Sequence, residues 1–229
     1  TPMRTLPLVV IAASCLGAFV VRESACAQEP QSSRDEALRL IEQLASPNEA
    51  PTERRGPDLK YPSGYERKKQ AKVHEARHAL KALGPSAFEA LIEKWGDERY
   101  CLTYSVGING YMENASVGRI CRTIVYDQLQ PYGLWPLTDD DPRGRAKRPM
   151  YPAKFLRNQK AAREWLADHK DKSLYELQLM VLDWIIAEEA KEPDAFTDKE
   201  HRELQRLRRK LVETKTPMLQ GNYYVDDYE

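Results

Sequence analysis

Apolar residues recur at intervals of three and four through most of this 229-residue chain, and proline or glycine interrupts the pattern between segments. This spacing places apolar side chains on one face of an α-helix. The segments that carry it are 33–45, 65–83, 88–95, 117–129, 155–166, 173–191 and 197–212. They predict an all-α fold, an irregular helical bundle of six or seven helices with long loops.

Several of these segments begin with the spacing of a capping box, in which a hydroxyl caps a backbone N–H and a Glu three residues later reaches back. We therefore expect helices to start at four such pairs: Ser33 with Glu36, Ser86 with Glu89, Ser173 with Glu176, and Thr197 with Glu200.

Three stretches lack the helical pattern. Residues 46–64 hold prolines and glycines among charges, which indicates a surface arm. Residues 97–115 alternate aromatic and aliphatic side chains before Asn109-Gly110, which predicts either a short hairpin or an aromatic-rich loop. Residues 131–152 are proline-rich and charged. Long loops often carry function, so the candidate binding residues are Tyr100, Tyr104, Trp135, Arg143 and Arg145.

The first 27 residues have the pattern of a signal peptide. Arg4 precedes an uncharged apolar run, and Ala25-Cys26-Ala27 is a small-x-small cleavage sequence. We expect a secreted or periplasmic protein, cleaved near Ala27. The rest is expected to comprise an N-terminal helix and proline-rich arm (28–64), a helical domain (65–215) and a C-terminal tail (216–229).

The charge balance argues against one class of partner. The chain has 35 basic and 35 acidic residues, whereas proteins that bind nucleic acid normally carry a basic excess that neutralises phosphates. We therefore expect no nucleic-acid partner. No later apolar run approaches the roughly 20 residues that a membrane span requires, so we expect no membrane span after the signal peptide.

Two cysteines, Cys101 and Cys121, follow the signal peptide. In an oxidising compartment they could pair as a disulfide. The alternative is two buried thiols, because Cys121 lies on the apolar face of its predicted helix.

One short motif indicates metal chemistry. His74-Glu75-Ala76-Arg77-His78 matches H-E-x-x-H within a predicted helix. Histidines at positions i and i+4 share a helix face and can both bind zinc, while the intervening glutamate acts as general base on the metal-bound water. The motif would make His74 and His78 metal ligands and Glu75 catalytic.

The surroundings of the motif favour a different interpretation. A catalytic zinc needs a third protein ligand, and the downstream candidates carry no distinguishing signature: Glu89, Glu93, Glu98 and Glu113. Arg77 places a cation beside the pair, which opposes binding of a dication. Metallopeptidases with this helix usually carry a sheet ahead of it, and none is predicted there. We therefore expect no cofactor and water-facing histidines, with zinc as the alternative.

The motif helix resembles a HEAT repeat. From Ala76 to Ile92 the chain reads ARHALKALGPSAFEALI, with small residues where paired helices approach and Gly84-Pro85 at the turn. The resemblance covers about one repeat, residues 71–95, and no second copy is clear. It implies a protein-binding scaffold rather than an enzyme. The chain also resembles exported helical proteins of planctomycete-type bacteria, a resemblance that implies no particular activity.

These observations lead to two hypotheses. The first is a non-catalytic exported protein that binds another protein or an envelope component. The alternative is a zinc-dependent hydrolase, similar to a metallopeptidase, that uses the motif at 74–78.

Overall fold

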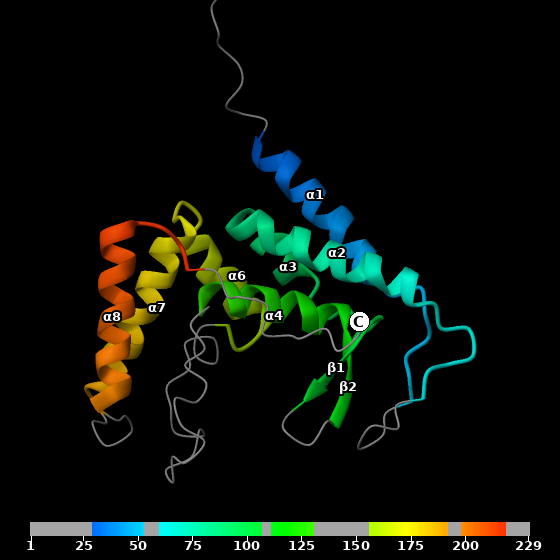
Figure 1. Ribbon diagram of the computed structural model, residues 1–229. Coiled ribbons are helices and arrows are strands. Elements are labelled where there is room, and N and C mark those ends of the chain that lie inside the picture. Colours follow the sequence, from blue (N-terminus) through cyan, green and yellow to red (C-terminus); the bar gives the residue numbers. More distant parts are fainter. Residues whose placement is uncertain (1–28, 53–59, 107–110, 131–155, 192–197, 219–229) are drawn as a thin grey trace, which may run out of the picture.

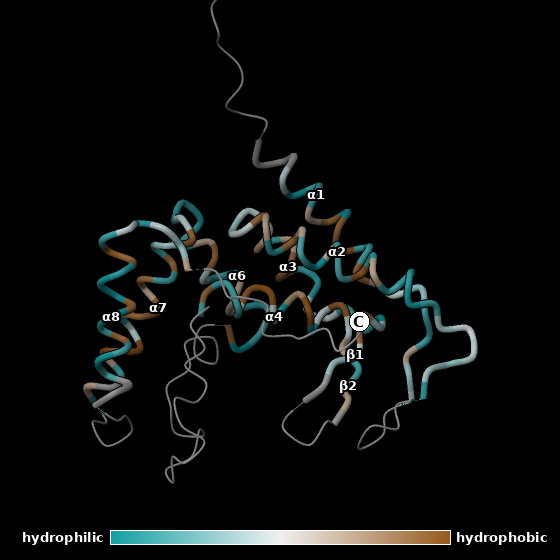
Figure 2. Tube along the Cα trace, viewed as in Figure 1, coloured by the Kyte–Doolittle hydropathy of each residue, from teal (hydrophilic) through white to brown (hydrophobic). Residues whose placement is uncertain are grey.

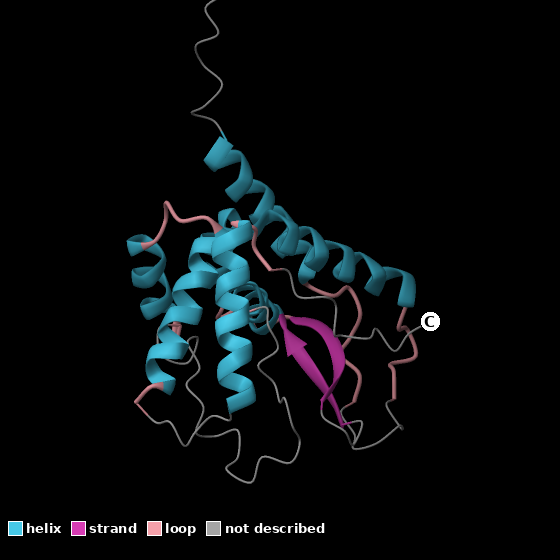
Figure 3. Ribbon diagram, turned by 60° about the vertical axis from the view of Figure 1, so that its left-hand side comes forward, coloured by secondary structure: helices cyan, strands magenta, loops and turns pink. Residues whose placement is uncertain are grey.

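The computed structural model describes residues 29–52, 60–106, 111–130, 156–191 and 198–218. Within them the chain is mostly helical and carries one small two-stranded sheet (Figures 1 and 3). The elements are α1 (Glu29–Leu44), α2 (Arg67–Leu83), the 3₁₀ turn η1 (Gly84–Ala87), α3 (Phe88–Glu93), β1 (Tyr100–Val106), β2 (Tyr111–Ser116), α4 (Val117–Leu129), α6 (Gln159–Asp168), α7 (Leu174–Glu189) and α8 (Asp198–Thr214).

The all-α prediction is therefore correct for the helices and wrong in omitting a sheet. Of the two alternatives for residues 97–115, the hairpin is confirmed: β1 pairs with β2 antiparallel. The register is irregular between Tyr100, which opposes Ser116, and Leu102, which opposes Ala115. Cys101 is thus an extra residue on its strand, as in a β-bulge, and both Cys101 and its neighbour Leu102 are buried.

The four predicted helix caps can be compared with the observed helix starts. Ser173 and Glu176 form the predicted capping box, with the Ser173 backbone N–H donating to Glu176 Oε2 at 2.8 Å. Ser33 and Ser86 are not caps, because α1 begins four residues before Ser33 and Ser86 lies inside η1. The fourth predicted cap, Thr197, lies outside the described residues.

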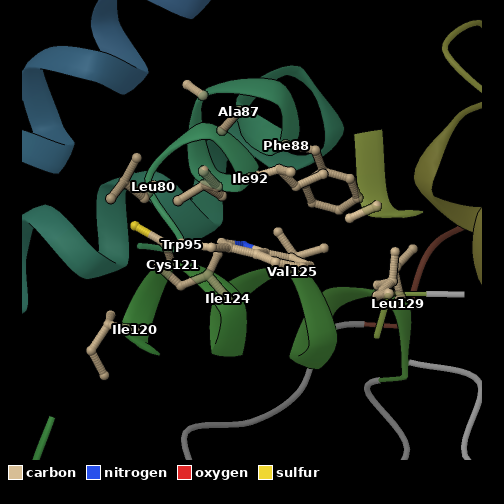
Figure 4. Packing of buried hydrophobic residues seen from close by; sticks show 14 of the residues in the cluster. Leu80, Ala87, Phe88, Ile92, Trp95, Ile120, Cys121, Ile124, Val125 and Leu129 are labelled. Carbon is tan, nitrogen blue, oxygen red and sulfur yellow. The ribbon is translucent and has the colours of Figure 1, made fainter. Parts of the chain in front are cut away.

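The core is formed where α1, α2 and α3 pack together and α4 closes the group from below (Figure 4). Leu80, Phe88 and Ile92 meet Ile124 and Val125 there, all five at least 99% removed from solvent. Trp95 lies between the two groups, with its ring edge-on to Tyr126 at a centroid distance of 6.1 Å. Burial of these apolar side chains stabilises this part of the molecule.

The helices after residue 155 extend this core on one side. α6 packs on α3, and α7 lies between α4 and α8 at the edge of the molecule (Figure 1). On α8 the apolar side chains Leu204, Leu207 and Leu211 are buried toward α7, while the remaining positions are mostly hydrophilic (Figure 2). None of the helices described is both long and apolar enough to cross a membrane.

Candidate functional site

The H-E-x-x-H motif lies on the middle turns of α2, as its helical pattern predicts. Helical spacing puts His74 and His78 one turn apart on the same face. His74 is half-buried and His78 is exposed. Together with Glu75 they line a cavity of about 320 Å³ between α2, the segment before it and β1. The motif therefore borders a cavity that is open to solvent at His78 and Glu75.

The opposite side of this cavity comes from segments that are distant in sequence. Its remaining lining residues are Tyr61, Tyr65, Arg67, Gln70, Ala71, Leu102 and Thr103. The Tyr61 and Tyr65 rings are 4.6 Å apart between centroids and tilted by 56°. They present aromatic surface beside the two imidazoles.

Arg77 lies between the two histidines along α2, but its side chain is buried rather than turned into the cavity. Its side chain is only 6% exposed, and it is not among the described residues that line the cavity. Its charge instead acts on Lys81, lowering that ammonium's pKa beyond the effect of burial, and on the Cys101 thiol. Arg77 is therefore buried beside the motif histidines and does not line the cavity.

A hydrogen-bond network around Gln70 holds the walls of the cavity together. The Gln70 side chain is buried, and its Nε2 donates to the backbone oxygen of Cys101 at 2.8 Å. This bond satisfies a carbonyl at the bulge of β1. Gln70 Oε1 accepts a hydrogen bond from Ser46 Oγ at 2.8 Å, and the Ser46 backbone N–H donates to the Tyr100 carbonyl at 2.8 Å. One amide thus joins the arm, α2 and the hairpin.

A second set of bonds fixes the arm at both ends. Asn48 Oδ1 accepts from the Glu66 backbone N–H at 2.9 Å, just before α2 begins. Asn114 Nδ2 donates to the Pro51 carbonyl at 2.8 Å, while Thr103 donates to Asn114 Oδ1 at 2.6 Å. The predicted surface arm is therefore attached to the hairpin, and its last residues form a wall of the cavity.

The predicted binding residues of the hairpin have structural contacts. Tyr100 is half-buried, and its hydroxyl is 2.9 Å from Thr103 Oγ1. Burial raises the pKa of Tyr100, which hydrogen bonds to Thr103 and Tyr65 partly offset. Tyr104 is half-buried with the Arg119 guanidinium 5.2 Å from its ring centroid. Neither residue lines the cavity. The other three candidates, Trp135, Arg143 and Arg145, lie outside the described residues.

Cys101 and Cys121 are both free and buried in the structure, which is the second of the two alternatives that the sequence left open. Burial raises the pKa of Cys101 to about 12 and raises that of Cys121 further. Neither thiol is poised for nucleophilic chemistry, because the reactive form is the thiolate.

The fit to a metal is partial. Two imidazoles and one carboxylate line the cavity, and imidazole suits zinc and other first-row dications. Across the part of the chain that the structure describes, no three His, Cys, Asp or Glu side chains form a group that could hold a metal ion. The predicted third ligands are elsewhere: Glu93 is paired with Arg34 and Glu113 with Arg119, and neither Glu89 nor Glu98 lines the cavity.

Sequence analysis missed the residues that complete the cavity: Tyr61, Tyr65, Arg67 and Thr103. A signal was present in the two tyrosines, four residues apart just ahead of the motif helix. Comparison with protein-family models, curated proteins and solved structures finds no match to this chain.

Proposed function

We propose that this protein is a non-catalytic exported binding protein, and that it holds part of a protein or envelope component in the cavity between α2 and the hairpin. The observation that carries the proposal is the composition of that cavity. Tyr61 and Tyr65 offer aromatic surface, while Arg67, His74 and His78 offer polar groups that can fix an orientation. Ligand sites typically combine an apolar lining with a few convergent polar groups.

The size of the cavity limits the kinds of ligand that it can hold. About 320 Å³ is near the lower limit of sites that enclose small molecules, which span roughly 300–1,000 Å³. The space suits one large side chain or one head group of a larger molecule. Tyrosine and arginine are also the residue types that most often carry binding energy at protein interfaces. The HEAT-like pattern of α2 and α3 supports the same proposal, as a resemblance.

Site-specific photo-crosslinking in cells tests the proposal. Ala71 is exposed and lines the cavity, so a photo-reactive side chain there should capture the partner. Val212 on α8 is 44% exposed and is not among the cavity residues, which makes it the matched control position. We expect a crosslinked species from position 71 that is absent at 212 and is reduced by Tyr65→Ala. Equal crosslinking at both positions, or none at 71, would contradict the proposal.

A zinc-dependent hydrolase is the second candidate, and one observation favours it: the motif residues face a cavity that is bordered by a β-strand. His74 and His78 would hold the ion, which would supply an activated water, and Glu75 would accept a proton from that water. Purified protein should then contain stoichiometric zinc that His74→Ala removes and His169→Ala retains. Zinc-dependent peptide hydrolysis should also disappear in Glu75→Gln. Metal-free, folded protein without hydrolysis would end this alternative.

A further inference from the structure

A second hollow, separate from the motif cavity, runs between α1, η1 and α6. It consists of two adjoining parts of about 800 Å³ and about 390 Å³. They share four lining residues, Pro85, Ser86, Leu166 and Lys170, so the two parts form one continuous groove. We call it the α6 groove. None of its lining residues belongs to the cavity between α2 and the hairpin.

The framework of the α6 groove is fixed by polar contacts at one end. Gln159 Nε2, at the start of α6, donates to the carbonyls of Ile92 and Glu93 at 2.8 Å each. Arg34 on α1 reaches Glu93 on α3 with two contacts of 3.0 and 3.1 Å. These bonds attach both α1 and α6 to the end of α3, and so connect the two walls of the groove.

The two walls carry different charge. Arg163, Lys170 and Lys172 lie on the α6 side, and none of them forms an ion pair with a described residue. On the other side Arg34 and Glu93 neutralise each other, which leaves Glu89. Among the described residues, the groove therefore presents three cations and one carboxylate that form no ion pair, although the whole chain is neutral. A surplus of one sign on a concave surface concentrates ligands of the opposite sign.

Between the charges the groove is apolar. Pro85, Leu166 and Ala167 line its larger part, and Leu177 lines the smaller part. His169 closes the end of α6, where its Nδ1 lies 2.6 Å from the Trp165 carbonyl and its ring stacks on Trp165 at 4.9 Å. The lining thus combines apolar and basic side chains.

We propose that the α6 groove binds an acidic peptide segment of a partner protein, with carboxylates against Arg163, Lys170 and Lys172 and an apolar side chain against Leu166. Charge complementarity selects the acidic partner. The concave shape favours an extended chain over a membrane surface, which meets convex or flat basic faces. The apolar side chains of Pro85 and Leu166 favour a peptide with apolar residues over nucleic acid, whose backbone is uniformly charged.

Binding of a fluorescein-labelled peptide of repeating Glu and Leu, measured by anisotropy on the full chain, tests this proposal. The combined variant Arg163→Glu, Lys170→Glu, Lys172→Glu should weaken binding at least about tenfold, and Glu89→Lys should strengthen it about threefold. The matched control is Arg202→Glu, Arg209→Glu, Lys210→Glu, which makes the same charge change at exposed positions of α8. That control should retain the affinity to within about twofold. Circular dichroism and thermal unfolding establish that each variant is folded.

Three results would overturn the proposal. The first is an equal loss of affinity in the α8 control, which would show a response to net charge alone. The second is equal binding of a Lys–Leu peptide of the same length. The third is binding of anionic phosphatidylglycerol vesicles, but not of the Glu–Leu peptide, through the same three cations.

Discussion

Gln70 connects three segments around the motif cavity: the arm, α2 and the hairpin. It is 7% exposed and bonds to Ser46 and to the carbonyl of Cys101. A buried carbonyl that loses its donor costs more than the bond itself contributes, because it remains desolvated.

We expect Gln70→Leu to lower the free energy of unfolding by about 1–3 kcal/mol, measured by urea denaturation. Hydrogen exchange should also show faster opening of the Cys101 region. Gln43→Leu, at an exposed position of α1, is the matched control and should change stability by less than about 0.5 kcal/mol. Similar losses in both variants would show that the network does not depend on Gln70.

Cys101 and Cys121 are both buried free thiols. Because burial raises the pKa of Cys101 to about 12, its thiol is protonated at neutral pH. We expect iodoacetamide at pH 8 to leave Cys101 and Cys121 unmodified in native protein and to alkylate both after denaturation without reductant. Mass spectrometry of the peptides reads out each site. If neither cysteine reacts in denatured, unreduced protein, the two are joined in a disulfide, and the assignment of two free thiols is wrong.

At the scale of elements, the junction between α3 and α4 is unusually close. The Val117 and Gly118 backbone N–H groups donate to the carbonyls of Arg99 and Asp97, each at 2.8 Å. A Cβ on Gly118 would lie 2.3 Å from the backbone oxygen of Trp95, so any other residue must displace main chain. The start of α4 therefore depends on glycine because of contact, not because of its backbone conformation.

Gly118→Ala should destabilise the protein by about 1–3 kcal/mol, the usual cost of overpacking a tight contact. Gly96→Ala provides the comparison, since a Cβ there would meet nothing within 4 Å. Thermal or urea unfolding of the two variants should separate them clearly. A stability for Gly118→Ala equal to that of Gly96→Ala would mean that the junction is looser than described.

For the whole molecule, ion pairs between neighbouring elements determine the response to acid. Hydrogen bonds from Arg99 lower the pKa of Glu42 and of Asp97, and Arg119 does the same for Glu113. A carboxyl whose pKa is lower in the folded state binds protons more tightly when unfolded, so its contribution is present above the unfolded pKa and is lost as pH falls. Asp127 contributes to the pH dependence of stability with the opposite sign, because burial raises its pKa.

We therefore expect the urea midpoint to fall as pH decreases from about 5 toward 2, the range below the unfolded carboxyl pKa values. These ion pairs are largely exposed, so salt screens them. At 0.5 M sodium chloride, about five times the concentration at which the Debye length is near 10 Å, the urea midpoint should depend less on pH. A midpoint that is constant or rises over this range would show that Asp127 and other buried groups dominate the linkage.

Several features could be predicted from the sequence because they depend on neighbours along the chain. The apolar spacing of 117–129 matches α4 at both ends, and Ser173 with Glu176 marks the start of α7. The same local rule failed at Ser33, since a capping box works only where the preceding backbone leaves the helix, and α1 continues through that position.

Other features were decided by the tertiary structure alone. Whether the histidines of α2 face water or a cavity depends on how the arm and the hairpin pack against that helix, and periodicity records only which positions share a face. Arg77 is buried although it lies between the two cavity-lining histidines, and Cys101 is buried at a one-residue irregularity in strand pairing; both depend on contacts with segments that are distant in sequence. The sequence by itself determined the helices and the motif, because hydrogen bonds and caps within a segment are local. Packing between distant segments decided what the motif faces.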